Sequence, residues 1–215
     1  MAQVDNGLTQ GANRHWARLA DLLFRPFVYI AGLQSLLIGI AGILLAGLLG
    51  YLSNSHFDGV LDFHTGRPAA LPVFFAEGLA DWLALSIVLL VAGKLVSRTA
   101  FRAVDLLGTQ AMARWPTVLI AAAALAPQYQ RLLVGLVAQL GGLAGQVAIR
   151  PADIAVGGLA LLLMLLCIVW MVALMYQAYS LCCNVRGAKG AGSFVLALLA
   201  AEAISKVALI RLLTR

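Results

Sequence analysis

One uninterrupted apolar stretch constrains this chain more than any other feature. It runs from Tyr29 to Leu52, YIAGLQSLLIGIAGILLAGLLGYL, and contains no charged residue. A helix of this length crosses the roughly 30 Å hydrocarbon core of a bilayer. Because lipid offers no hydrogen-bond partners, a crossing segment pairs its backbone N–H and C=O groups internally, as a helix does. The stretch therefore predicts an integral membrane protein.

The composition agrees with a place in a membrane. Of 215 residues, 62% are apolar and 11% are charged, whereas a soluble domain is about half apolar and about a quarter charged. The net charge is +6, but the basic residues are scattered, which argues against nucleic acid as a partner and favours the positive-inside distribution of membrane proteins. Arg14, Arg18 and Arg25 precede the first span, and Arg98, Arg102 and Arg114 follow the second. This pattern places the N-terminus in the cytoplasm.

Further apolar stretches predict an all-α, polytopic transmembrane helical bundle with five spans, or six as the alternative. Additional spans are expected at Trp82–Val96, Ala155–Leu181 and Phe194–Leu213. Between them, Thr117–Ala126 is bounded by prolines and is too short to cross alone. The helix through this stretch must therefore either begin before Thr117, continue beyond Ala126, or join Leu132–Ile149 in a broken helix. The number of spans depends on this region, and so does the side on which the C-terminus lies.

The chain divides into a cytoplasmic N-terminal segment, 1–25, and a transmembrane domain, 26–215. Within the first, HWARLADLLF (His15–Phe24) has helical amphipathicity and is expected as a lead-in along the lipid headgroups. The first apolar run is too long for the core of a cleaved signal peptide, so it is expected to be retained. We expect Ser53–Gly78 to form an acidic outer loop and Ser97–Trp115 a basic, amphipathic inner connection.

Small residues recur at every fourth position of the first span. Such rows let helix backbones approach closely in lipid. They predict packing inside the bundle, with contact between two copies of the chain as the alternative. One row holds Ala31, Ser35 and Gly39, and the other holds Gly42, Ala46 and Gly50.

The last span carries two opposite charges, Glu202 and Lys206, on one helix face. An isolated charge in the bilayer costs several kcal/mol, so both side chains should be paired or face a wet interior. We favour a structural pair. The alternatives are a role in moving a proton or substrate, and contact of Lys206 with a headgroup.

The loop after the first span contains the pattern H-x-D-x3-D-x-H, and its residue types can bind zinc or a similar divalent ion. The Asp58-Gly59 turn could bring its two arms together. The spacing matches no established ligand pattern, so a solvated acidic loop is the favoured interpretation. The four candidate ligands are His56, Asp58, Asp62 and His64.

Nothing in the sequence supports an enzyme or a cofactor. It contains no nucleophile elbow, no phosphate-binding loop, no dinucleotide fingerprint and no HExxH motif. The expected partners are the lipid bilayer and, as alternatives, a second copy or another membrane protein.

Three stretches carry the features of one family. FRPFVY leads into the first span, Gly93–Pro116 forms the inner connection, and Trp170–Leu199 holds a Trp-containing span followed by a short basic turn. Together they resemble the Yip (Ypt-interacting protein) family in its bacterial form, although Met112 replaces the usual Tyr. The positions that carry the resemblance are Arg25, Pro26, Phe101, Ala111, Pro116 and Trp170.

The resemblance implies a five-span Yip domain in the bacterial cytoplasmic (inner) membrane. It also implies a non-enzymatic scaffold or a membrane-organising, trafficking-like partner. Eukaryotic members bind prenylated Rab GTPases, but this sequence lacks their acidic Tyr-Gly-Pro-like segment, so Rab binding is not expected. The alternative function is a small transporter or channel that uses Glu202, Lys206 and a broken helix near Pro116–Pro127.

Overall fold

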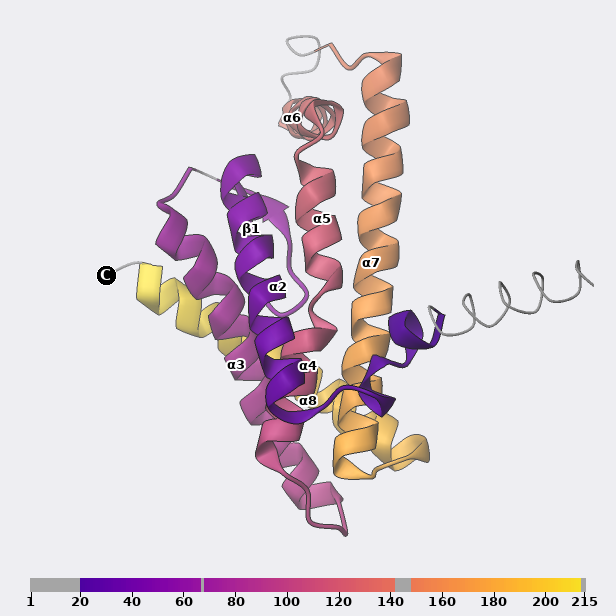
Figure 1. Ribbon diagram of the computed structural model, residues 1–215. Coiled ribbons are helices and arrows are strands. Elements are labelled where there is room, and N and C mark those ends of the chain that lie inside the picture. Colours follow the sequence, from indigo (N-terminus) through magenta and orange to yellow (C-terminus); the bar gives the residue numbers. More distant parts are fainter. Residues whose placement is uncertain (1–19, 67, 142–147, 214–215) are drawn as a thin grey trace, which may run out of the picture.

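The computed structural model describes residues 20–66, 68–141 and 148–213 of the chain. Within this part, four helices are each long and apolar enough to cross a membrane. They are α2 (Gly32–Ser53), α3 (Leu71–Val96), α7 (Pro151–Cys183) and α8 (Gly187–Leu213). They belong to one helical bundle (Figure 1), so the predicted all-α polytopic membrane fold is confirmed.

The middle of the chain forms a broken helix. Its pieces are α4 (Ala103–Ala113), α5 (Pro116–Ala124) and α6 (Pro127–Leu140). The first two together meet α6 at a bend of 81°. Pro127 causes the break, because a proline keeps the residue before it out of the helical conformation, and Ala126 is extended. If this bent pair counts as one span, the bundle has up to five spans. The apolar stretch Thr117–Ala126 then crosses the membrane as part of a helical segment that begins earlier, at Ala103.

Two predicted helix starts were wrong. α3 begins at Leu71 rather than at Trp82, so the last eight residues of the predicted outer loop, 71–78, are helical. The charged side chains of Glu77 and Asp81 lowered the hydropathy of this stretch, but both are buried inside the bundle. α8 likewise begins at Gly187 rather than at Phe194. Of the lead-in predicted at His15–Phe24, residues 15–19 lie outside the described residues.

The predicted inner connection, Ser97–Trp115, contains a helix that lies inside the bundle. Its helix, α4, packs among α2, α3 and α7, and Leu106, Ala111 and Ala113 are fully buried. Small residues allow this position, because a Cβ added at Gly108 would collide with the carbonyl oxygen of Gly32. The connection is thus part of the bundle core.

The segment after α2 folds back into the bundle. β1 (Ser55–His56) pairs antiparallel with β2 (His64–Thr65). Between them the chain dips among the helices, and Val60 at its tip is 1% exposed and packs in the main hydrophobic core. We call residues 55–65 the re-entrant hairpin. A solvated loop was expected here, but irregular backbone at this depth is tolerated because protein surrounds it.

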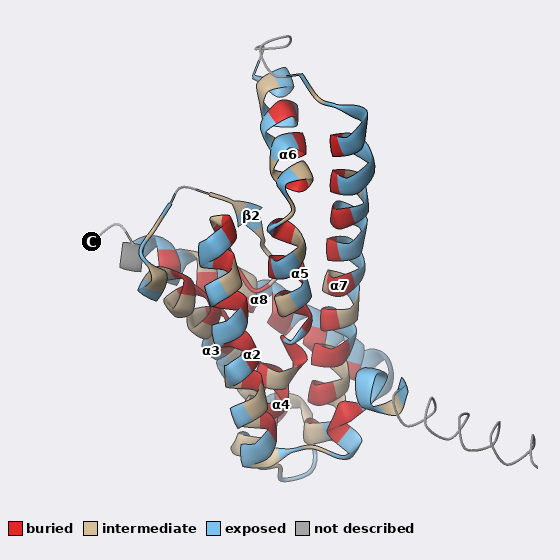
Figure 2. Cartoon of the chain, turned by 45° about the horizontal axis from the view of Figure 1, so that its top comes forward, coloured by how far each residue is buried: buried red, intermediate tan, exposed pale blue. Residues whose placement is uncertain are grey.

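Most of the large apolar side chains on the outer faces of the long helices are exposed, as expected for helices in contact with lipid. Figure 2 shows buried residues facing inward and exposed ones facing outward. Examples are Leu37, Ile87, Leu166 and Leu196, which are at least half exposed. In water such a surface would drive aggregation. In a bilayer it matches the surrounding hydrocarbon.

Candidate functional site

A buried ion pair lies at the centre of the bundle. Asp81 of α3 and Arg114, which follows α4, are 0% and 2% exposed, and the Nη2 of Arg114 donates to the Oδ2 of Asp81 at 3.3 Å. Ser205 of α8 donates to the other carboxylate oxygen. Arg114 also approaches the carbonyl oxygen of Val60 at 3.5 Å. The pair thus joins α3, the end of α4, α8 and the re-entrant hairpin. The sequence pattern assigned Arg114 to the basic residues that face the cytoplasm, and this was wrong because Arg114 is buried in the bundle.

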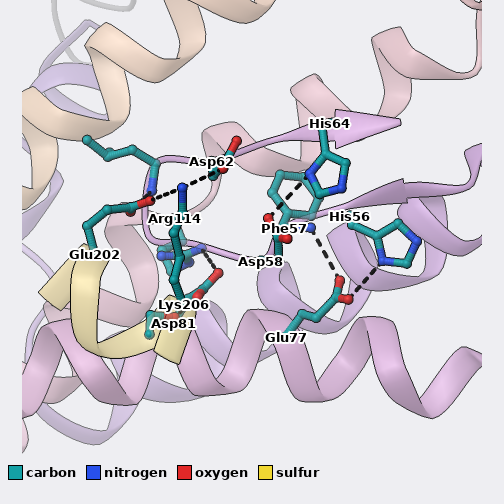
Figure 3. Close-up of polar contacts among 12 residues, drawn as sticks. His56, Phe57, Asp58, Asp62, His64, Glu77, Asp81, Arg114, Glu202 and Lys206 are labelled. Carbon is teal, nitrogen blue, oxygen red and sulfur yellow. Dashed lines mark hydrogen bonds and ion pairs between the residues drawn. The ribbon is translucent and has the colours of Figure 1, made fainter. Parts of the chain in front are cut away.

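The predicted charged pair on α8 reaches the same hairpin (Figure 3). The Nζ of Lys206 lies 3.2 Å from Oε1 of Glu202 and 2.7 Å from Oδ2 of Asp62. The backbone N–H of Leu61 donates to Oε2 of Glu202 at 2.9 Å. Gly59 permits this approach, since a Cβ there would lie 3.0 Å from Cε of Lys206. These two side chains therefore anchor the hairpin tip.

A third contact holds the first strand of the hairpin. Nδ1 of His56 lies 2.8 Å from Oε1 of Glu77 on α3, and Glu77 is 1% exposed. The backbone N–H of Phe57 donates to the second carboxylate oxygen of Glu77 at 3.3 Å. The His56 ring stacks on Phe74, with centroids 4.5 Å apart. One carboxylate thus fixes both the backbone and a side chain of the hairpin.

The four predicted metal ligands do not form one group. Ligand atoms of Asp58, Asp62 and His64 lie within 4.8 Å of one another, whereas His56 turns to Glu77. Within the trio, Nδ1 of His64 lies 3.3 Å from Asp58, and Asp62 binds Lys206. A neighbouring ammonium disfavours a divalent cation at the same carboxylate. The trio is better described as part of the hairpin's own ion pairs.

The small residues that were predicted to pack helices together contact other elements of the same chain. A Cβ at Gly39 would collide with Ala111 of α4, one at Gly42 would lie 3.0 Å from the Trp115 ring, and one at Gly50 would lie 2.7 Å from the carbonyl oxygen of Ser55. Within the same helix, Ala46 is 3% exposed. The chain's own elements cover these rows except at Ala31, which is exposed.

Four of the six residues behind the Yip resemblance lie at or just before helix starts, whereas Ala111 and Trp170 lie within α4 and α7. Pro26 begins the short 3-10 helix η1 (Pro26–Val28), which Arg25 precedes, and Pro116 begins α5. Phe101, ahead of α4, packs against the main core. Nε1 of Trp170 donates to the carbonyl oxygen of Leu23 at 3.2 Å and ties the N-terminal segment to α7.

The sequence reasoning missed Glu77, Asp81 and Ser205. The available signal was a pair of carboxylates in a stretch that otherwise continues the apolar pattern of α3. An ionisable residue inside a span is a candidate site by default. Extending the second span back to Leu71 would have placed both carboxylates within it.

Comparisons of the chain with protein-family models, curated proteins and solved structures found no significant match. The Yip resemblance therefore stays a prediction from the sequence. What the chain does is inferred from its geometry.

Proposed function

We propose that this chain is a non-enzymatic membrane protein of the Yip type that acts as a scaffold for other membrane components. One observation carries the proposal: buried and partly buried charged side chains of the helices hold the re-entrant hairpin. Asp81 and Arg114 pair beneath its tip, and Glu202 and Lys206 bind its backbone and side chains. A transport site needs charged groups that exchange partners with a solute. These groups are engaged in a fixed internal structure.

An apolar cavity beside the hairpin supports the same proposal. It has a volume of about 800 Å³ and opens between β2 and α6. Phe63, Tyr129, Leu133, Val137 and Leu161 contribute to its lining, whereas Arg114, Glu202 and Lys206 do not. Such a surface suits an apolar group better than a charged solute. The cavity is thus suited to contact with lipid or with a partner's span.

A small transporter or channel is the second candidate. It is favoured because charged groups from α3, α4 and α8 meet in a bundle that also contains the broken helix α5–α6, an arrangement found at transport sites. However, the carbonyl oxygen of Ala124 at the break accepts a hydrogen bond from Nε2 of Gln130 at 2.8 Å. The same nitrogen donates to Ser53 at 3.2 Å. The break is thus internally satisfied, which favours the scaffold.

Site-specific photo-crosslinking in native membranes tests the scaffold. A photoreactive residue would replace one outward-facing side chain on each long helix: Leu37, Ile87, Leu162 or Leu196. We expect a discrete protein adduct from one helix face and lipid adducts from the others. Lipid adducts alone at all four positions would contradict the scaffold.

Flux measurements test the second candidate directly. Purified protein in liposomes should show no proton flux above that of empty liposomes. Flux that is present in the natural protein and lost in Glu202→Gln/Lys206→Met, with Lys94→Met as the exposed control, would favour the transporter instead.

A further inference from the structure

Two neighbouring cavities open at the end of the bundle where α3 and α7 end and α8 begins. The first, about 310 Å³ in volume, is lined by Arg98, Arg186 and Lys189 together with residues of the two turns that follow α3 and α7. The second, about 410 Å³, is lined by Arg25 and again by Arg186. Among the described residues, no acidic side chain lines either cavity. We call the first of them the basic pocket.

The cations of the basic pocket have no carboxylate partner among the described residues. Within the described residues, Lys189 donates only to the carbonyl oxygen of Val96, at 3.4 Å. The same residues form no ion pair with Arg98 or Arg186. Elsewhere the pattern differs, since Arg131 pairs with Asp153 at 2.8 Å. Three like charges around one cavity repel each other until an anion enters.

The start of α8 lies beside the same pocket, because Lys189 of its first turn lines it. The helix begins at Gly187, and no acidic residue occupies its first turn. The first N–H groups of a helix have no internal partner and carry the positive end of the helix dipole. A Cβ added at Gly187 or Gly192 would meet nothing within 4 Å, whereas one at Gly190 would lie 3.0 Å from the backbone of Val185, so this end is open on the side of Gly187 and Gly192. Phosphate groups bind readily at such helix ends.

The surroundings of the pocket are those of a bilayer surface. Leu95 at the end of α3 is 81% exposed, Leu181 near the end of α7 is 42% exposed, and Val28 is 57% exposed. Acyl chains can lie along these side chains while a headgroup occupies the pocket. Basic pockets between membrane helices commonly hold anionic headgroups.

We infer that the basic pocket binds the phosphate group of an anionic phospholipid. Arg98, Arg186 and Lys189 neutralise the phosphate, and the start of α8 donates backbone hydrogen bonds to it. A lipid is favoured over a free phosphate ion because apolar, lipid-facing side chains flank the pocket.

Native mass spectrometry of the intact chain, with phosphatidylglycerol and phosphatidylcholine as probes, tests this site. Arg98→Gln/Arg186→Gln removes two charges from the pocket. Lys94→Gln/Arg102→Gln removes two exposed charges from the same end and serves as the matched control. We expect the pocket variant to bind phosphatidylglycerol about tenfold more weakly, because it removes two of the three cations that line the pocket. The control should stay within about twofold of the natural chain.

Three further outcomes complete the test. Arg98→Lys/Arg186→Lys keeps the charge and should retain most of the binding, which separates charge from a fold defect. Equal losses in the pocket variant and the control would overturn the site, because they would show a general surface potential. The lipid assignment would be overturned if inorganic phosphate bound to the chain and phosphatidylglycerol bound no better than phosphatidylcholine.

Discussion

Arg114 illustrates how burial governs the contribution of a single side chain. A guanidinium in the bundle interior loses its hydration, which costs several kcal/mol unless partners replace the water. Asp81 supplies the opposite charge, and the carbonyl oxygen of Val60 lies within reach. Ser205 then satisfies the second oxygen of Asp81. The pair is therefore stable as a unit, and either member alone is not.

We expect Arg114→Met to lower the free energy of unfolding by about 3–5 kcal/mol, because Asp81 is left buried and unpaired. Thermal unfolding in mild detergent measures the loss. Arg102→Met is the control, since Arg102 is 77% exposed and lies 3.9 Å from Asp105, and it should change stability by about 0.5 kcal/mol or less. The double variant Asp81→Leu/Arg114→Met should recover part of the loss. Equal effects of the two single variants would contradict the structural role of the pair.

At the scale of elements, α2 and α4 approach each other as closely as backbones allow. A side chain at Gly39 would overlap the backbone of Ala111, and α4 has no room to move away because it also packs against α3 and α7. Without a hydrophobic drive between helices in lipid, such close packing is the main source of helix association.

Gly39→Val should separate α2 from α4 and reduce the yield of folded, monodisperse protein several-fold. Gly158→Val is a matched control, because it adds the same side chain within helix α7, where nothing lies within 4 Å. Size-exclusion chromatography and thermal unfolding give the comparison. If the two variants behave alike, the close α2–α4 contact is not needed for folding.

The re-entrant hairpin is the element that sequence reasoning could not place. α2 was predicted to within a few residues because its stretch carries no charge. The insertion of the hairpin depends on partners far away in the chain, since Leu61 and Glu202 are 141 residues apart. Hydropathy depends on local composition, so it cannot predict a contact between residues that lie so far apart in the sequence. The Glu202 and Lys206 pair was visible as a helical spacing, but its contact with Asp62 was not.

We expect Glu202→Gln/Lys206→Met to speed hydrogen exchange in the hairpin, residues 55–65, by about tenfold or more, because two charge-assisted contacts are lost. Hydrogen–deuterium exchange with mass spectrometry measures this locally. Lys94→Met, at an exposed position of α3, should leave the hairpin unchanged. Unchanged exchange in the double variant would mean that the apolar tip alone holds the hairpin.

At the scale of the whole molecule, charge is distributed unevenly between the two ends of the bundle. The connection from α3 to α4 and the turn from α7 to α8 lie at one end, and the hairpin and α6 lie toward the other (Figure 1). At the hairpin end, Arg131 belongs to α6, Arg150 precedes α7, and Lys206 and Arg211 belong to the last turns of α8, where Lys206 contacts the hairpin. By the positive-inside rule, the first end should face the cytoplasm. The basic residues at that end are Arg25, Lys94, Arg98, Arg102, Arg186 and Lys189.

This asymmetry, together with α4–α5 as a crossing helix, fixes a testable topology. Single cysteines would be placed at Ala70, Thr99, Ala148 or Ala188 in a background whose native cysteines are replaced by alanine, with that background as the control. A thiol reagent that does not cross membranes should label Ala70→Cys and Ala148→Cys in intact cells, because both follow an odd number of crossings from a cytoplasmic N-terminus. Thr99→Cys and Ala188→Cys should react only after permeabilisation. The reverse pattern would invert the orientation. If Ala148→Cys reacted only after permeabilisation, as Thr99→Cys does, and Ala188→Cys reacted in intact cells, the broken helix would turn back without crossing, which leaves four spans rather than five.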